Sequence, residues 1–144
     1  MNAPDPHFAA RIRDSFSRQK AMTLIGASLG VIEPGCVEIV LPFRDDLTQQ
    51  KGFIHGGIIG MIADSACGYA AFSLMPSNSS LVTVEYKINI LAPARGALVA
   101  RGHVIRPGRT LTVTRGEVYA EDGKQVAVMQ QTLMVLADTP DTPE

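Results

Sequence analysis

The sequence predicts an α+β protein in which an antiparallel β-sheet of about five or six strands wraps around one long central helix. Residues 58–74 are almost wholly apolar, and a helix that is apolar on all sides belongs inside a protein. Six other segments have the composition or the alternation of strands, and short turns separate the last four of them. Because one flat sheet face cannot cover a helix on all sides, the sheet must curve around it.

The first half of the chain contributes a helix and two strands ahead of the central helix. Residues 7–22 predict an amphipathic helix, because their large apolar side chains recur on one side. Two β-rich segments follow at 23–31 and 35–42, around the turn composition Glu33-Pro34-Gly35. A polar connection at 44–51 then leads into a glycine-rich stretch.

The second half of the chain is a run of strands. Residues 81–91 alternate between apolar and polar side chains, as a strand with one buried face does. The expected apolar face consists of Val82, Val84, Tyr86, Ile88 and Ile90, and the polar face of Thr83, Glu85, Lys87 and Asn89. Strands at 97–105, 110–120 and 125–136 follow, each after a turn that contains glycine. Such short turns predict that these consecutive strands are antiparallel neighbours.

Together these elements describe a single domain with the hotdog fold, in which a curved sheet encloses a central helix. With 144 residues and 46% hydrophobic content, the chain has enough apolar material for one core. We expect the domain to span residues 1–144, with its core at about 20–136. The Pro-rich residues 1–6 and the acidic, Pro-rich residues 137–144 are expected to be flexible tails.

Composition and charge exclude several classes of partner. A net charge of −1 and a pI near 6.3 leave no basic surface for nucleic acid. The N-terminus lacks the basic and apolar regions of a signal peptide, and residues 58–74 are slightly short for a membrane span and contain Asp64. We therefore expect a cytoplasmic protein that does not enter a membrane. Cys36 and Cys67 are expected to be free thiols, and no cluster has the spacing of a metal site.

The residues best suited to chemistry are Gly52-Phe53-Ile54-His55-Gly56-Gly57 and Asp64 within the apolar helix. An ionised carboxylate is rarely buried without a partner or a task. Adjacent glycines at the start of a helix leave its unpaired N–H groups open to a ligand oxygen. An acid together with exposed N–H donors suits attack on a carbonyl. The alternative is a structural Asp64 that is hydrogen-bonded to backbone at a dimer interface.

These residues resemble the signature of the PaaI-type hotdog acyl-CoA thioesterases, in which His-Gly-Gly precedes an acid. The resemblance continues through Thr83-Val84-Glu85-Tyr86 and the turns at 92–96 and 107–110, and it covers about residues 20–136. It implies a homo-oligomer that hydrolyses an acyl-CoA to a carboxylic acid and CoA, with no metal or redox cofactor.

The resemblance also implies a role for each catalytic residue. Asp64 would act as a general base on water or as a nucleophile, and the N–H of Gly56 would polarise the thioester carbonyl. His55 would brace the loop or contact the substrate, and Thr83 would help to place the water. Gln49 falls where the family most often has Asn, aligned with the substrate carbonyl or the water. Gln is one methylene longer than Asn, and its neighbour at position 50 could substitute for it.

A second set of residues falls where relatives hold the pantetheine and phosphates of CoA. Taken by themselves, Arg106 and Arg109 are ordinary solvated turn residues, yet two arginines flanking Pro-Gly suit a phosphate. The residues assigned to the CoA part of the substrate are Arg95, Arg106, Pro107, Gly108, Arg109 and Thr110.

The spacing of Gly56 and Asp64 predicts a site shared between two chains. The two residues are eight positions apart on one helix, which is about 12 Å along its axis. An Asp side chain and one hydrogen bond close only part of that gap. We therefore expect a two-fold dimer, or a dimer of dimers, in which Gly56 of one chain faces Asp64 of the other. Gly60 and Gly68, one turn either side of the acid, would leave room for an acyl chain or water.

Two other functions fit parts of the pattern. A hotdog dehydratase or hydratase that acts on acyl thioesters also pairs a His with a carboxylate, but its loop and spacing resemble this chain less. A non-catalytic acyl-CoA-binding protein would keep the cleft and the CoA turns, yet it would tolerate loss of Asp64. The acyl group itself, whether aryl, medium-chain or long-chain, is not specified by the sequence.

Overall fold

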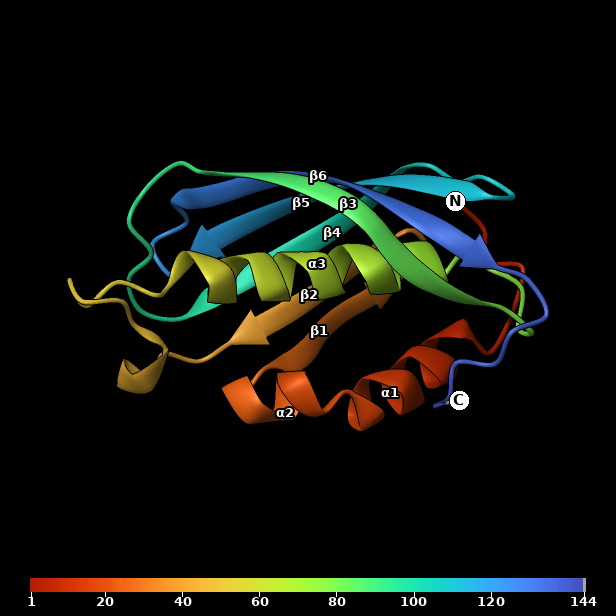
Figure 1. Cartoon of the computed structure of the whole chain (residues 1–144), viewed down its shortest axis with the longest axis horizontal. Coiled ribbons are helices and arrows are strands. Elements are labelled where there is room, and N and C mark those ends of the chain that lie inside the picture. The colour runs from red at the N-terminus through yellow and green to blue at the C-terminus, as the bar shows by residue number, and fades with distance from the viewer. Residues whose placement is uncertain (144) are drawn as a thin grey trace.

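The structure confirms an α+β fold in which one sheet encloses a long helix. It is a computed structural model that describes residues 1–143. Six antiparallel strands lie in the order β1-β2-β4-β5-β6-β3, and helix α3 runs along the inner face of the sheet (Figure 1). The strands are β1 (Ser28–Glu33), β2 (Cys36–Leu41), β3 (Ser80–Ile90), β4 (Leu98–Arg106), β5 (Leu111–Ala120) and β6 (Gln125–Leu136). The helices are α1 (Phe8–Arg18), α2 (Lys20–Ile25), α3 (Gly56–Phe72) and the 3₁₀ turn η1 (Asp45–Leu47).

Two glycines let the sheet approach α3 closely. Gly102 on β4 and Gly116 on β5 are direct cross-strand partners. A Cβ atom at Gly102 would lie 2.3 Å from the carbonyl oxygen of Ala66, and one at Gly116 would lie 3.0 Å from Sγ of Cys67. A side chain at Gly102 would therefore push the helix off the sheet. This contact sets the height of α3 above the sheet beside Asp64.

One side of α3 is left partly uncovered by the sheet, and it carries the acid. The sides of the helix that face the strands are buried. The remaining side consists of Met61, Asp64, Ser65 and Gly68, which are half-buried. These residues are three or four positions apart, as one helix face requires. The helix that the sequence predicts as apolar all round is thus enclosed on most sides, and Asp64 lies on the remaining one.

The N-terminal segment differs from its prediction. Two helices, α1 and α2, meet at Gln19, whose backbone leaves the helical conformation with φ −82° and ψ 89°. The prediction of a strand over 23–31 is wrong for its first part, because α2 continues through Ile25. Met22 and Ile25 are both buried, one helical turn apart, so core packing overrides the local strand preference. Gly26 ends α2 with φ 76°, a left-handed conformation that glycine adopts without strain.

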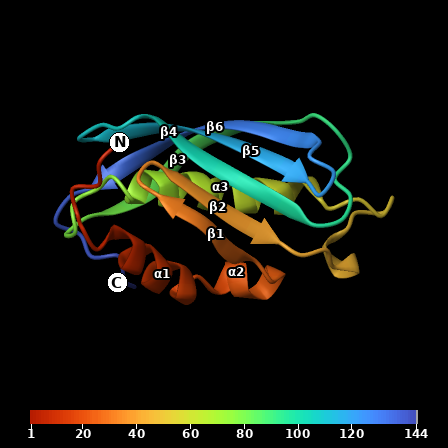
Figure 2. The same ribbon diagram turned by 180° about the vertical axis from the view of Figure 1, so that it is seen from behind.

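The strand order also corrects the sequence prediction. Strands β3 and β4 are consecutive but not neighbours, because β3 pairs with β6 at the sheet edge and β4 lies between β2 and β5 (Figures 1 and 2). The backbone of the connection at 91–97 forms hydrogen bonds with other parts of the chain and does not close a hairpin between β3 and β4. Leu91 donates its N–H to the carbonyl of Val126, and the carbonyl of Ala94 accepts from the N–H of Ile54. The predicted β4–β5 and β5–β6 neighbours are confirmed.

A β-bulge in β3 changes which side chains of that strand face α3. The register with β6 shifts just after Thr83, so the predicted strict alternation is broken there. Before the bulge, the Thr83 hydroxyl contacts Asp64, whereas after it the Tyr86 hydroxyl packs against α3. Val82 and Val84, expected on the buried face, are about half exposed, at 46% and 52%. The bulge thus turns Thr83 toward the acid and apolar side chains toward solvent.

Helix α1 closes the C-terminal end of α3 through Arg11. Its guanidinium donates hydrogen bonds to the carbonyl oxygens of Phe72, Met75 and Pro76. Carbonyls at a helix end lack partners within the helix, and positive charge there complements the helix dipole. Arg11 also pairs with the buried carboxylate of Asp5 at 3.2 Å. These contacts tie the N-terminal segment to the central helix.

Both segments that the sequence predicts as flexible tails make contacts with the domain. Asp5, from the first of them, is buried against Arg11. In the second, the backbone carbonyl and the carboxylate of Asp141 both accept hydrogen bonds from Arg18 on α1. Glu144 lies outside the described residues. The flexibility of the two segments stays a prediction.

We expect Arg11→Met to lower the free energy of unfolding by about 3 kcal/mol, because the buried carboxylate of Asp5 loses its charged partner and three carbonyls at and after the end of α3 lose a charged donor. Methionine preserves the apolar stem of the side chain. Denaturant unfolding followed by circular dichroism measures the loss. Arg18→Met on the same helix is the control, since its carboxylate partners are accessible to solvent and it should matter far less. Equal losses in the two variants would contradict the role of Arg11.

Candidate active site

The start of α3 presents one open backbone donor. His55 caps the helix, since its Nδ1 accepts a hydrogen bond from the N–H of Gly57 at 2.8 Å. The His55 carbonyl oxygen accepts from the N–H groups of Ile58 and Ile59. The N–H of Gly56 has no hydrogen bond to another described residue. No atom outside its chain neighbours lies within 4 Å of where a Cβ of Gly56 would be, so a ligand oxygen can approach this donor.

Gln49 lies in the turn that leads to this donor. Its N–H donates to the carbonyl of Phe53 at 2.8 Å, and its own carbonyl accepts from the N–H of Gly52 at 2.9 Å. Gly52 closes the turn with φ 85°. The side-chain oxygen of Gln49 accepts a hydrogen bond from the N–H of Lys51. That oxygen is therefore used within its own turn, which leaves the amide NH₂ of Gln49 to meet a ligand.

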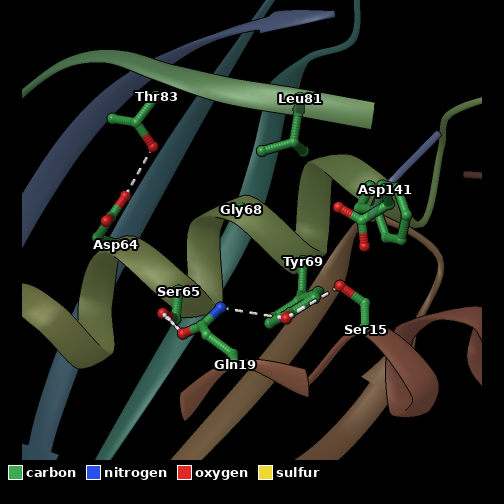
Figure 3. Close-up of a pocket in the computed structure, with 10 residues that line it drawn as sticks. Ser15, Gln19, Asp64, Ser65, Gly68, Tyr69, Leu81, Thr83 and Asp141 are labelled. Carbon is green, nitrogen blue, oxygen red and sulfur yellow. Dashed lines mark hydrogen bonds between the residues drawn. The ribbon is translucent and has the colours of Figure 1, made fainter. Parts of the chain in front are cut away.

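Asp64 lies in the middle of α3 and is held through one carboxylate oxygen (Figure 3). Its Oδ1 accepts hydrogen bonds from Oγ1 of Thr83 at 2.9 Å and from Nε2 of Gln131 at 2.7 Å. The same Nε2 also donates to the Thr83 hydroxyl oxygen at 3.0 Å. No described residue donates to Oδ2. One oxygen thus fixes the side chain, and the other is open to water or substrate.

Gln131 is a residue of this site to which the sequence motif did not point. It is fully buried on β6, with a relative exposure of 0%. The residues two positions before and after it, Met129 and Leu133, are buried and apolar. A strand places alternate residues on one face, so the amide occupies an inward, otherwise apolar position. A buried amide needs a polar partner. The signal available in the sequence was therefore a glutamine at a position of the strand whose alternate neighbours are apolar.

The predicted catalytic residues fall into two groups along α3. Gln49, His55 and Gly56 lie together at its start, whereas Asp64 and Thr83 meet near its middle. Because the helix is unbroken between them, the two groups are about 12 Å apart along its axis. A single carbonyl group of a ligand cannot contact both groups within one chain.

A pocket of about 190 Å³ lies beside Asp64, between α3, α1 and β3 (Figure 3). Part of its wall is a chain of polar side chains. Gln19 accepts a hydrogen bond from Ser65 at 3.0 Å and donates to the Tyr69 hydroxyl at 3.2 Å. Tyr69 and Ser15 share a further hydrogen bond of 3.2 Å. Burial raises the pKa of Tyr69, so its hydroxyl stays protonated at neutral pH.

Of the two glycines expected to leave room beside the acid, only Gly68 does so. Gly68 lines the pocket. A Cβ at Gly60 would instead lie 3.4 Å from the hydroxyl of Tyr86, so the space on that side is already filled. Tyr86 was expected on the buried face of its strand, but the prediction did not consider that its side chain would reach over Gly60.

A buried thiol lies beneath the acid. Burial raises the pKa of Cys67 to about 12, so the thiol is protonated at neutral pH. The thiolate is the nucleophilic form of cysteine, and Cys67 is therefore not a candidate nucleophile at neutral pH. Both Cys36 and Cys67 are free of disulfide bonds.

The residues predicted to hold CoA lie at opposite ends of α3. The guanidinium of Arg95 stacks on the ring of Phe53 at 4.4 Å, just before the start of the helix. The turn at 106–110 lies beyond the other end, where Arg109 lines a pocket of about 160 Å³ together with Met75. The 17 residues of α3 separate these places by about 25 Å. One chain therefore does not bring all of the predicted CoA residues together.

Residues 1–143 show neither a membrane-spanning helix nor a cluster of metal ligands. None of the helices there combines the length and the hydropathy that crossing a bilayer requires. Within the same residues, no three His, Cys, Asp or Glu side chains converge in a way that could hold a metal ion.

A curved sheet around α3, with an acid at mid-helix and an open N–H donor at the helix start, defines a hotdog-fold protein that carries groups suited to attack on a carbonyl. The chain belongs to the thioesterase superfamily, because the sequence model of that family matches residues 51–127, more than half of its 144 residues. The matched region contains the start of α3, Asp64 and Thr83 and ends before Gln131.

Curated relatives cover most of the chain. A protein of Halobacterium salinarum that is provisionally named an esterase is 28% identical over 141 residues, which is 90% of this chain and 93% of that protein. The 1,4-dihydroxy-2-naphthoyl-CoA hydrolase of Listeria monocytogenes is 24% identical over 112 residues, 77% of this chain and 91% of that protein. These names agree with hydrolase activity in the family.

Solved structures share the fold. A thioesterase family protein from Silicibacter pomeroyi is 47% identical with a TM-score of 0.87, over 90% of this chain and 98% of that one. The E. coli PaaI protein from the phenylacetic acid degradation operon is 20% identical with a TM-score of 0.84, over 92% of this chain and 96% of that one, and this likeness shows the fold alone. The predicted resemblance to PaaI-type hotdog thioesterases is confirmed.

Proposed function

We propose that the protein hydrolyses acyl-CoA thioesters to a carboxylic acid and CoA in the cytoplasm. The observation that carries the proposal is the pair of groups on α3. Gly56 has an open N–H, and Asp64 has a carboxylate with one unengaged oxygen. Membership of the thioesterase superfamily supports hydrolysis, and the Listeria relative is by name a hydrolase of an acyl-CoA.

In the proposed reaction, Oδ2 of Asp64 takes a proton from a water molecule, whose oxygen attacks the thioester carbonyl carbon. The N–H of Gly56 donates a hydrogen bond to the carbonyl oxygen as negative charge develops there. Collapse of the tetrahedral intermediate breaks the C–S bond, and the CoA sulfur leaves and takes up the proton. The same open oxygen could instead attack the carbonyl directly, giving an anhydride that water hydrolyses.

We place the two groups in one site across a two-fold dimer. Strand β3 is an edge strand of 11 residues, and Val82, Val84 and Ile90 on it are exposed. A long apolar edge strand is a template for pairing with another chain. Because Thr83 on this strand contacts Asp64, a partner that pairs here arrives beside the acid. Its Gly56 then completes the site.

The dimer also explains why the arginines lie at opposite ends of α3. A two-fold axis perpendicular to the helix makes the two copies of α3 antiparallel. When Gly56 of one chain faces Asp64 of the other, the second helix runs on for about 12 Å past that Gly56. The turn at 106–110 of the second chain then lies on the same side of the site as Arg95 of the first. Two arginine sites that are distant within one chain can thus serve one CoA.

The pocket beside Asp64 is proposed to receive the acyl group. Its volume of about 190 Å³ is below the roughly 300–1,000 Å³ of pockets for drug-sized ligands, so a short or single-ring acyl group fits better than a long alkyl chain. The polar chain from Ser65 through Gln19 to Tyr69 disfavours a plain alkyl tail, because desolvated polar groups would stay partly unpaired.

An assay of thiol release separates this proposal from its two rivals. A hydratase or dehydratase would change the acyl group and leave the thioester bond intact. A non-catalytic acyl-CoA-binding protein would bind the ester and release no thiol. A panel of short, aryl and long-chain acyl-CoA esters, read with a colorimetric thiol reagent, tests the reaction and its acyl preference together.

Asp64→Asn should lower kcat by about a hundredfold or more, because it removes the base or nucleophile and changes little else. Thiol release measures the effect, and a thermal melt checks that the fold is intact. Glu85→Gln is the matched control. Glu85 is a carboxylate on β3, the strand that contacts Asp64, but it is exposed and accepts a hydrogen bond from Thr132. Near-wild-type turnover by pure Asp64→Asn protein would remove Asp64 from the mechanism.

Mixed dimers of two inactive variants should recover activity if the site is shared. One chain carries Asp64→Asn, and the other carries Gly56→Pro, which removes the N–H donor. Proline is tolerated in the first helical position, where Gly56 lies. Co-refolding equal amounts gives about half mixed dimers, each with one intact site of two, hence about a quarter of wild-type activity.

Each variant must first be shown to fold and to be inactive alone. Mass spectrometry of the refolded sample confirms that mixed dimers are present. A sample that contains mixed dimers but hydrolyses nothing would refute the shared site, because a site built from one chain carries a lesion in every copy.

The same mixed dimers show which chain supplies the turn arginines. Arg106→Ala and Arg109→Ala in the Gly56→Pro chain should raise KM for CoA esters about tenfold, since a charged hydrogen bond is lost. In the Asp64→Asn chain they should leave the recovered activity unchanged. A pantetheine thioester, which lacks the nucleotide, should be insensitive in both cases. Equal effects from either chain would overturn the assignment.

A further inference from the structure

We propose that Gln131 is a positioning residue that holds Asp64 in its reactive orientation, an inference that rests on the proposed hydrolysis. Gln131 lies on β6, 67 residues from Asp64 in the chain, and its Nε2 donates to Oδ1 of the acid at 2.7 Å. Gln131 is fully buried and does not line the pocket beside the acid. It therefore acts through Asp64 rather than on the substrate.

The hydrogen bonds around Oδ1 have one consistent set of directions. The Nε2 amide of Gln131 has two hydrogens, which reach Oδ1 of Asp64 and Oγ1 of Thr83. Because the Thr83 oxygen accepts from the amide, its own hydrogen is directed to Oδ1 of Asp64. Two donors thus converge on one carboxylate oxygen. This fixes the plane of the carboxylate and leaves Oδ2 as its reacting atom.

This network also restricts the role of Thr83. Its hydroxyl hydrogen is engaged with Asp64, so Thr83 can contact the attacking water only as an acceptor. The amide of Gln131 sets that polarity. A rotated amide would place Oε1 against Oδ1 of the acid, two acceptors in contact, so the ionised carboxylate selects the orientation with nitrogen toward it.

The fold alone does not explain a glutamine at this position. Oε1 of Gln131 is buried with no hydrogen-bond partner among the described residues, which is unfavourable for stability. The flanking inward residues Met129 and Leu133 are apolar, and an apolar side chain of similar size would leave no unpaired atom. A polar residue that burdens the fold but organises an acid is characteristic of a functional site.

The test is Gln131→Met, which keeps the length of the side chain and removes both donors. We expect kcat for an acyl-CoA ester to fall roughly ten- to a hundredfold, the range seen when partners that orient a reacting group are lost. KM should stay within about twofold, since Gln131 does not meet the substrate. The thermal midpoint should not fall, because the variant also removes the unpaired oxygen.

Two comparisons isolate the effect on the acid. In an Asp64→Asn background, Gln131→Met should change the residual rate by less than about twofold, because the group that it positions is gone. Leu133→Val, at the next inward position of β6, should lower the thermal midpoint and leave kcat of the folded protein unchanged. A loss of kcat in both β6 variants, in proportion to lost stability, would assign Gln131 to the fold and overturn the proposal.

Wild-type protein measured in parallel distinguishes the two possible failures. If wild type releases thiol and Gln131→Met matches it in kcat and KM, the positioning role is refuted and the proposed hydrolysis stands. If wild type releases no thiol from any ester of the panel, the hydrolysis itself is refuted and the positioning role falls with it.

Discussion

The contact between α3 and the paired glycines Gly102 and Gly116 is the constraint on which the rest of the structure depends. A Cβ at Gly102 would lie 2.3 Å from the carbonyl oxygen of Ala66, so the helix rests on bare backbone. The helix is also held at its start by the His55 cap and at its end by Arg11. With these three points fixed, the backbone position of Asp64 follows from packing, and hydrogen bonds then orient its side chain.

Much of this arrangement could be predicted because its signals are local. The apolar run of α3, the glycines before it and the alternation of the later strands are each contained in a short window. The order of β3 and β4 could not be predicted, since turn composition does not say to which edge of the sheet a strand goes. The roles of Gln131 and Gln19 could not be predicted either, because their hydrogen-bond partners Asp64 and Ser65 are 67 and 46 residues away in the chain. The bulge that brings Thr83 to Asp64 also has no signal in the neighbouring residues.

Two features that look unfavourable in a single chain have one explanation. The edge strand β3 exposes apolar side chains such as Val82 and Val84, which invites pairing with another chain. The proposed oxyanion donor and the proposed base are on one helix yet about 12 Å apart. The proposed two-fold partner along β3 would cover the exposed edge and supply the missing half of each proposed site. The same contact would then provide stability and catalytic competence, so an isolated chain would lack both.

The buried amide of Gln131 illustrates the advantage of a side-chain donor over a water molecule as the hydrogen-bond partner of Asp64. A water molecule could donate to Oδ1, but it would be mobile and could equally occupy Oδ2, where the proposed reaction needs an open atom. Gln131 is fixed in β6 and can reach only Oδ1 and Thr83. A preorganised donor needs no reorientation as charge moves during the reaction. The unpaired Oε1 of Gln131, buried away from solvent, is the stability cost of that rigidity.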